Sequence, residues 1–260
     1  QRQMCIRDSM RIDNVDVYVT GSNARFLSRD IITEFRGRGD ELHIQPLSFA
    51  EFMSVYNGNK YDGWNEYVLY GGLPPVVLLP TSEQKIELLK NLFQETYIND
   101  IVGRHSIKNK AEFEELIDIL SSGIGSLTNP KKLADTFKSK KNKTISQNTI
   151  KSYLDYLCDA FIVSRATRYD IKGRKYIDTP QKYYFSDIGL RNARINFRQI
   201  EETHTMENII YNELVGRGYN VDVGIVTVSQ ADKSGNCVRK QLEVDFVCNL
   251  SLIHISEPTR

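Results

Sequence analysis

The sequence lacks long apolar runs and has few cysteines. None of its hydrophobic stretches approaches the roughly 18 to 20 residues that a membrane-spanning helix needs, so we expect no membrane partner. Its four cysteines (Cys5, Cys158, Cys237 and Cys248) are far apart and without the spacing of a metal site. Dispersed cysteines and the absence of a secretory signal predict a reduced, cytoplasmic protein.

The two ends look foreign to the rest of the chain. The segments QRQMCIRDS and LSLIHISEPTR resemble translated sequencing-adapter read-through. We therefore set aside residues 1–10 and 250–260 in reasoning about the fold and expect a chain cut at both ends. The alternative is that these are ordinary chain termini.

The charge is unevenly distributed. Residues 126–182 contain 13 Lys and Arg against 5 Asp and Glu, a net charge of +8, although the whole chain carries only +1. A basic middle within an acidic remainder is typical of a surface that binds a polyanion. The alternative is a solvated, lysine-rich surface without a partner.

The first credible segment predicts alternating strands and helices. Residues 15–20 (VDVYVT) indicate a buried strand, residues 27–35 a helix, and residues 41–45 (ELHIQ) a second strand stopped by Pro46. Strand, helix and strand within about thirty residues favour an α/β domain. Ser48 and Glu51 form a capping box that predicts another helix, and a long amphipathic helix is expected over 82–102.

The middle of the chain predicts a winged helix-turn-helix. Helices are expected over 111–122, from Asn129-Pro130, and from Ser146 as an N-cap, followed by strands over 161–169 and 182–185. In this fold the helix that begins at Ser146 enters the major groove of duplex DNA. A winged helix can instead bind a protein partner.

The candidate DNA contacts are amides and basic side chains in this region. Gln and Asn side chains suit adenine edges, and Lys and Arg suit phosphates. The predicted nucleic-acid-binding residues are Lys131, Lys132, Lys141, Lys143, Gln147, Asn148, Lys151, Arg174 and Lys175.

The strand over 15–20 ends in small polar residues. P-loop NTPases place such a residue beside the phosphates, where it orients the attacking water, so Thr20, Ser22 and Asn23 are sensor-like catalytic candidates. Arg38 is a candidate for stabilising charge on the transferred phosphate. The alternative is that Thr20 to Asn23 form only a turn and a helix cap.

Several short sequence segments, which occur in this order along the chain, resemble a known family. VYVTGSNARFLS, FRGRGDELHIQPLSFAEF, YVLYGGLP, KYYFSDIGLRNA, MENIIYNELVGRGY and LEVDFV are similar to AAA-superfamily ATP-binding proteins with a C-terminal DUF4143 region. The resemblance runs from about Val15 to Asn249. It implies ATP and Mg²⁺ as cofactors of an intact parent ATPase.

The phosphate-binding loop that this resemblance implies is missing. No Gly-Lys-Ser or Gly-Lys-Thr occurs anywhere in the chain, although this motif supplies the nucleotide cradle. We therefore expect the chain to retain a sensor strand, to bind no cofactor by itself and to be inactive as an ATPase.

The C-terminal part resembles a restriction-endonuclease-like core. Glu207 on a helix and Glu243 and Asp245 on a strand are the metal-site candidates, since such cores hold Mg²⁺ with carboxylates. Glu243 and Asp245 are two residues apart and so share a strand face. The family's following strand, with an acidic residue and a lysine, is missing, and Lys240 is a poor substitute. The alternative is a set of exposed carboxylates at a domain edge.

The fold prediction is therefore an α/β remnant of a P-loop (AAA-type) ATPase domain, a winged helix-turn-helix and a partial restriction-endonuclease-like α/β domain. The expected segments are 11–60 (ATPase core), 61–110 (helical lid or linker), 111–195 (winged helix) and 200–249 (nuclease-like). The predicted function is an AAA-type ATPase fragment acting on DNA. The alternatives are a nucleotide-gated regulator that binds DNA or protein without nuclease activity, and a metal-dependent nuclease with a regulatory ATPase.

Overall fold

The computed structural model describes residues 18, 42–141, 144–173, 175–198, 201–231 and 237–250. Of the predicted strand over 15–20 only Tyr18 is described, and it is in neither helix nor strand and 86% exposed. The rest of that strand, the predicted helix over 27–35 and the candidates Thr20, Ser22, Asn23 and Arg38 lie outside the described residues. Within the described ranges, no helix is both long and apolar enough to cross a membrane.

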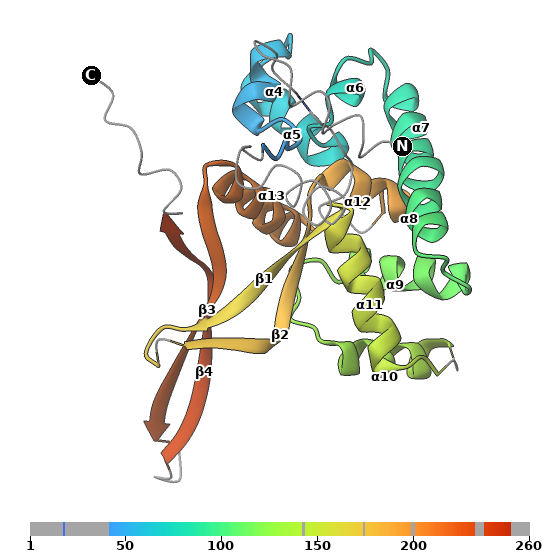
Figure 1. Ribbon diagram of the computed structural model, residues 1–260. Coiled ribbons are helices and arrows are strands. Elements are labelled where there is room, and N and C mark those ends of the chain that lie inside the picture. The colour runs from blue at the N-terminus through green and yellow to red at the C-terminus, as the bar shows by residue number, and fades with distance from the viewer. Residues whose placement is uncertain are drawn as a thin grey trace, which may run out of the picture.

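The first half of the described chain is helical (Figure 1). Its elements are α4 (Phe49–Val55), α5 (Lys60–Tyr70), α6 (Pro74–Val77), α7 (Ser82–Asn91), the π-helix η2 (Leu92–Ile98) and α8 (Asn99–Arg104). The segments α7, η2 and α8 follow one another without a break, which confirms the long helix predicted over 82–102. Its apolar stripe is buried, since Leu89, Phe93 and Ile101 are at most 2% exposed.

The capping box at Ser48 is confirmed. The Ser48 hydroxyl accepts a hydrogen bond from the Glu51 backbone N–H, and the Glu51 carboxylate accepts one from the Ser48 backbone N–H at 2.8 Å. The strand predicted over 41–45 is wrong for the described residues 42–45, which are in neither helix nor strand. Leu42 and Ile44 are more than 80% exposed, so their alternation with polar residues reflects no buried face.

The middle of the chain contains the elements predicted for the winged helix, in the predicted order. They are α9 (Lys110–Ser122), α10 (Pro130–Lys141), α11 (Gln147–Asp159), β1 (Val163–Asp170) and β2 (Lys175–Phe185). Asn129 and Ser146 cap α10 and α11 through their side-chain oxygens, as the sequence predicted. β2 begins seven residues earlier than expected, so the β1–β2 hairpin is longer.

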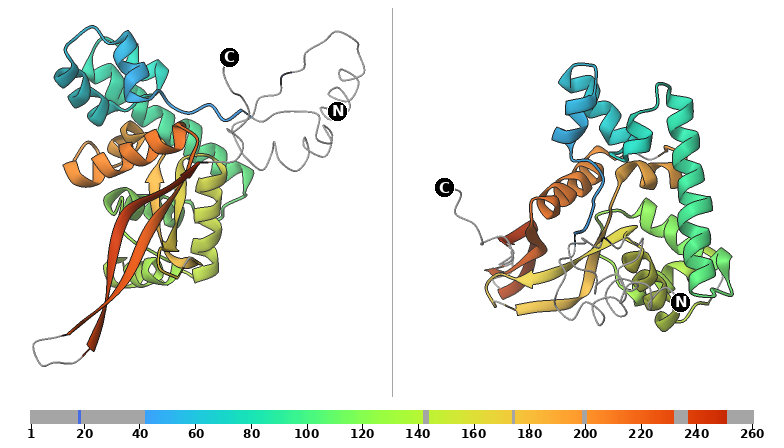
Figure 2. Two further views of the ribbon diagram at one scale, coloured as in Figure 1. Left: turned by 90° about the vertical axis from the view of Figure 1, so that its left-hand side faces the viewer. Right: turned by 45° about the horizontal axis from the view of Figure 1, so that its top comes forward.

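This hairpin is part of a larger mixed sheet. After β2 come α12 (Ile188–Arg194), α13 (Glu202–Gly216), β3 (Tyr219–Ala231) and β4 (Cys237–Leu250). The strand order is β2-β1-β3-β4, with β1 and β3 parallel and the other pairs antiparallel. The predicted strands over 221–228 and 240–247 are thus confirmed but too short. The far ends of β3 and β4 extend away from the helices (Figure 2).

Helices cover both faces of the sheet near its centre. Tyr183 faces α11, because its ring lies under Arg165, which pairs with Asp155 of that helix. The next residue, Tyr184, points to the other face and stacks on Tyr211 of α13 with ring centroids 4.3 Å apart. The sheet is therefore the layer between α11 and α13.

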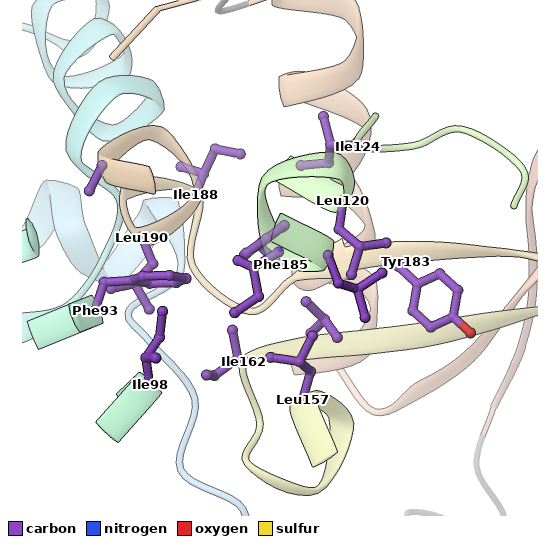
Figure 3. Close-up of a cluster of buried hydrophobic side chains, with 14 of the residues drawn as sticks. Phe93, Ile98, Leu120, Ile124, Leu157, Ile162, Tyr183, Phe185, Ile188 and Leu190 are labelled. Atoms are coloured by element: carbon purple, nitrogen blue, oxygen red, sulfur yellow. The ribbon is translucent and has the colours of Figure 1, made fainter. Parts of the chain in front are cut away.

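A single hydrophobic cluster joins most of the helices to the sheet. It extends from Phe52 in α4 to Ile209 in α13 and includes residues of α7, η2, α9, α10, α11 and β2. Figure 3 shows its centre, where Phe93 and Ile98 lie beside Ile188 and Leu190, and Leu120 and Leu157 lie beside Phe185. The segments expected as 61–110 and 111–195 thus share one core.

Two sequence segments that carry the family resemblance, YVLYGGLP and KYYFSDIGLRNA, contact each other in the interior of the fold. Asp187, which caps α12, accepts hydrogen bonds from the backbone N–H of Gly72 at 2.8 Å and of Leu190 at 3.1 Å. Gly71 has a φ of +77°, and a Cβ there would lie 2.3 Å from the Asp187 carboxylate. The Tyr70–Leu73 turn and the start of α12 therefore fit only with glycine at this position.

Candidate functional site

The N-terminal half of α11 presents polar side chains to solvent. Gln147, Asn148 and Lys151 are exposed, whereas Ile150 and Leu154 are buried against the core. Ser146 caps the first turn of α11, and no acidic residue in that turn offsets the positive end of the helix dipole. These three candidates therefore lie together on one accessible helix face.

The other predicted DNA contacts are only partly described. Lys131 and Lys132 are exposed in the first turn of α10, and the Lys132 ammonium donates a hydrogen bond to the Leu127 carbonyl at 2.8 Å. Lys143 and Arg174 lie outside the described residues, and the side chains of Lys141 and Lys175 do as well.

A second constellation lies on the α13 face of the sheet. The ammonium of Lys182, in β2, is 2.7 Å from a carboxylate oxygen of Glu207 in α13 and 2.7 Å from one of Glu243 in β4. Asp245 is 3.7 Å away. The three carboxylates predicted as metal ligands are thus brought together, and a lysine lies between them.

The Glu207 carboxylate is held from several sides. It accepts a hydrogen bond from the Tyr184 hydroxyl at 2.6 Å, and the Nδ1 atom of His204 lies 3.8 Å from its other oxygen. Gly125, with a φ of +72°, lets the loop after α9 approach, because a Cβ there would be 3.0 Å from Glu207 Oε2. Glu207 is therefore fixed at the junction of three elements.

A bulge in β4 brings Asp245 toward this cluster. Asp222 pairs with Val247 and Gly224 pairs with Val244, so Asp245 and Phe246 together oppose the single residue Val223. Asp245 lies near Lys182, while Phe246 lies 6.3 Å from the Tyr184 ring. The extra residue lets both side chains reach the α13 side of the sheet.

Burial and pairing act in opposite directions on Lys182. Its side chain is 3% exposed, and this burial by itself would lower its pKa, but the hydrogen bonds to Glu207 and Glu243 outweigh burial and raise the pKa above the ordinary value. The pKa of Tyr184 is also raised, first by burial and then by its hydrogen bond to Glu207. Lys182 is therefore an ammonium and Tyr184 a neutral donor at neutral pH.

These residues do not fit a metal ion as they are arranged. Among the described residues, no group of three or more His, Cys, Asp or Glu side chains has the arrangement of a metal site. The ammonium of Lys182 lies where the oxygen atoms of Glu207 and Glu243 converge. We therefore derive no metal-dependent step from this cluster.

Lys182 is the functional candidate that sequence reasoning missed. It lies in the segment KYYFSDIGLRNA, yet the only lysine weighed from the sequence for the carboxylate site was Lys240, which is exposed. One signal was available: Lys182 is two residues before Tyr184, so the two side chains share a strand face. A lysine followed by buried aromatic residues indicates a cation paired inside the fold.

Two models of known protein families match parts of this chain. The family model for "AAA domain" matches residues 3–53, beginning inside the segment 1–10 that was set aside. This match supports an AAA-type ATPase-like part, joined here to a mixed α/β structure with a four-stranded sheet. The chain belongs to the family described as "Domain of unknown function (DUF8612)", whose model matches residues 61–201. The expected DUF4143 region is not confirmed.

Two curated relatives are similar over most of the chain. An uncharacterized protein of Haemophilus influenzae is 36% identical over 233 residues, covering 87% of this chain and 58% of the relative. The uncharacterized protein MJ1544 of Methanocaldococcus jannaschii is 30% identical over 244 residues, covering 89% of this chain and 52% of the relative. The chain thus spans somewhat more than half the length of these relatives.

Proposed function

We propose that this chain is part of an AAA-type ATPase that acts on duplex DNA, and that α11 is the DNA-contacting helix. The observation that carries the proposal is the exposed group Gln147, Asn148 and Lys151 on the first half of a capped helix. Two amides and a lysine on one face provide both base-edge and phosphate contacts.

The surroundings of α11 support this proposal. Lys131 and Lys132 are exposed at the start of the preceding helix, and Lys138 is exposed in the same helix. The β1–β2 hairpin follows α11 directly, as a wing follows a recognition helix. β1 of this hairpin also pairs with β3, which holds that side of the hairpin in the sheet.

Fluorescence anisotropy with a labelled DNA duplex tests the proposal. We expect Lys131→Glu combined with Lys151→Glu to weaken binding strongly, because each change removes a positive charge from a phosphate and adds repulsion. The magnitude of the slope of log K against log salt should fall by about 0.9 for each phosphate that is no longer neutralised, so by roughly 2 in the double variant. Lys60→Glu combined with Lys90→Glu, exposed lysines of α5 and α7, is the matched control.

The same assay separates base contacts from phosphate contacts. Gln147→Ala combined with Asn148→Ala should reduce discrimination between duplex sequences while leaving the salt slope nearly unchanged. Equal salt slopes for the Lys131/Lys151 variant and the Lys60/Lys90 control would contradict α11 as the DNA-contacting helix. Absence of salt-sensitive DNA binding by the unmodified chain would contradict DNA as its partner.

A further inference from the structure

The side of the sheet that α11 covers continues beyond that helix onto β3 and β4. Val223 packs with Tyr211 of α13, so the next residue, Gly224, points to the α11 side. In the strand register Gly224 lies between Tyr169 of β1 and Val244 of β4, and such neighbours share a face. The register defines an open sheet face that consists of Tyr169, Ile171, Tyr176, Val226, Leu242 and Val244.

The open sheet face is apolar and accessible. Tyr176 is 61% exposed, Leu242 44%, Val244 41% and Ile171 38%. Scattered apolar side chains on a surface need no explanation, but a contiguous group of them marks an interaction site. The strands β3 and β4 project beyond the helices (Figure 2), which leaves this part of the sheet accessible.

The charged residues near the open sheet face are divided between the two sides of the sheet. Lys240 is two residues before Leu242 and therefore shares the open sheet face, and Lys172 is exposed at the turn after β1. Glu243 and Asp245 lie on the α13 side instead, where they contact a buried ammonium. Lysines at an apolar face, with the exposed acids of β4 on the opposite side, favour a polyanionic occupant.

Tyr176 is held in place although its ring is exposed. Its hydroxyl donates a hydrogen bond to the Asp222 carboxylate at 3.2 Å, and its ring packs edge-on against Tyr169 with centroids 5.3 Å apart. Asp222 is buried and also accepts a hydrogen bond from the Thr167 hydroxyl. A ring that is already fixed loses little conformational entropy on binding, so Tyr176 is a preorganised surface on which a flat partner can stack.

We propose that the open sheet face binds a single-stranded DNA segment that leaves the duplex held by α11, with bases stacked on Tyr176 and phosphates near Lys172 and Lys240. Aromatic rings beside lysines are the chemistry that binds single strands without reading their sequence. A second copy of this chain would bring the same positive charges together, whereas DNA neutralises them. The inference rests on the proposed function, because α11 supplies the duplex on the same side of the sheet.

Fluorescence anisotropy with two labelled DNA probes tests this inference. One probe is a blunt duplex, and the other is the same duplex with a single-stranded extension of about ten thymidines, prepared in each strand polarity. We expect the full chain to bind one extended duplex about tenfold more tightly than the blunt one, the gain expected from one or two stacked bases.

The two probes separate this inference from the proposed function. Equal affinities for the blunt duplex and both extended duplexes would overturn the inference and leave α11 as the DNA-contacting helix. Binding of the extended duplex and of free oligothymidine, without binding of the blunt duplex, would contradict α11 and support the open sheet face. These outcomes come from the unmodified chain and do not depend on the folding of any variant.

Variants assign the effect to the ring of Tyr176. Tyr176→Ala should weaken binding of the extended duplex about tenfold more than binding of the blunt duplex, and Tyr176→Trp should retain the preference. Tyr61→Ala, which removes an exposed tyrosine of α5, is the matched control and should also retain it. Full preference in Tyr176→Ala would overturn the inference. A dimer in sedimentation velocity that Leu242→Ser dissociates would assign the open sheet face to a second copy and overturn it as well.

Discussion

Lys182 and Asp187 are both 3% exposed and five residues apart, but they are stabilised in different ways. Asp187 is held by backbone N–H groups of the Tyr70–Leu73 turn and of α12. Lys182 is held by the side chains of Glu207 and Glu243. Backbone donors are fixed by the fold, whereas side-chain carboxylates can turn toward water when their partner is removed. The comparison separates a charge held by the backbone from one held by other side chains.

Asp187→Ala should have the largest effect on stability. It removes the N-cap of α12 and leaves the buried N–H groups of Gly72 and Leu190 without an acceptor. We expect a loss of about 3 kcal/mol in the free energy of unfolding at pH 5, measured by urea denaturation. Asp135→Ala, at an exposed position in α10, is the control and should change stability by less than about 0.5 kcal/mol. Equal losses in the two variants would contradict a structural role for Asp187.

The pH dependence of stability should report the Asp187 carboxyl. Burial raises its pKa from 3.8 to about 6, although backbone hydrogen bonds oppose this shift. A carboxyl with a raised folded-state pKa binds more protons in the folded state, so it stabilises the fold at low pH and this stability is lost as pH rises from about 4 to about 6. The difference in stability between the unmodified chain and Asp187→Ala should therefore shrink over that window, by at most about 3 kcal/mol. A constant difference would show that the pKa is not raised.

Local signals in the sequence predicted local structure well. The starts of α4, α10 and α11 follow from Ser48, Asn129-Pro130 and Ser146, because a cap is a contact among residues three or four apart. The strand prediction over 41–45 was wrong for the described residues 42–45, because alternation of apolar and polar residues does not indicate whether a partner strand is present. Apart from Tyr18, which is exposed and in neither helix nor strand, the helix and strand positions in residues 15–41 stay predictions.

Contacts between distant residues could not be predicted in the same way. The parallel pairing of β1 with β3 joins residues 55 positions apart, and no short pattern encodes it. The sequence supplied Glu207, Glu243 and Asp245 through resemblance, but the role of Lys182 became visible only in the structure, where β2 brings its ammonium to Glu207 of α13 and Glu243 of β4. The metal role assigned to the three carboxylates was therefore proposed without the cation that lies among them.

Lys182→Met should destabilise the fold less than Asp187→Ala does. The substitution leaves carboxylates facing each other, but Glu243 and Asp245 are partly hydrated and can turn toward water. We expect a decrease of about 2 kcal/mol in the free energy of unfolding, measured by urea denaturation. Lys240→Met, which changes an exposed lysine of β4, is the control. A decrease larger than that of Asp187→Ala would mean that Lys182 is as firmly built into the fold as Asp187.

Among the three carboxylates around the Lys182 ammonium, Asp245→Asn should have the smallest effect. Its carboxylate is 3.7 Å from the Lys182 ammonium and its side chain is 67% exposed, so water screens the interaction. We expect a change below about 0.5 kcal/mol in the free energy of unfolding, against about 1 to 2 kcal/mol for Glu207→Gln, whose carboxylate also accepts the Tyr184 hydroxyl. An effect on stability equal to that of Glu207→Gln would show that Asp245 is as firmly built into the structural framework as Glu207.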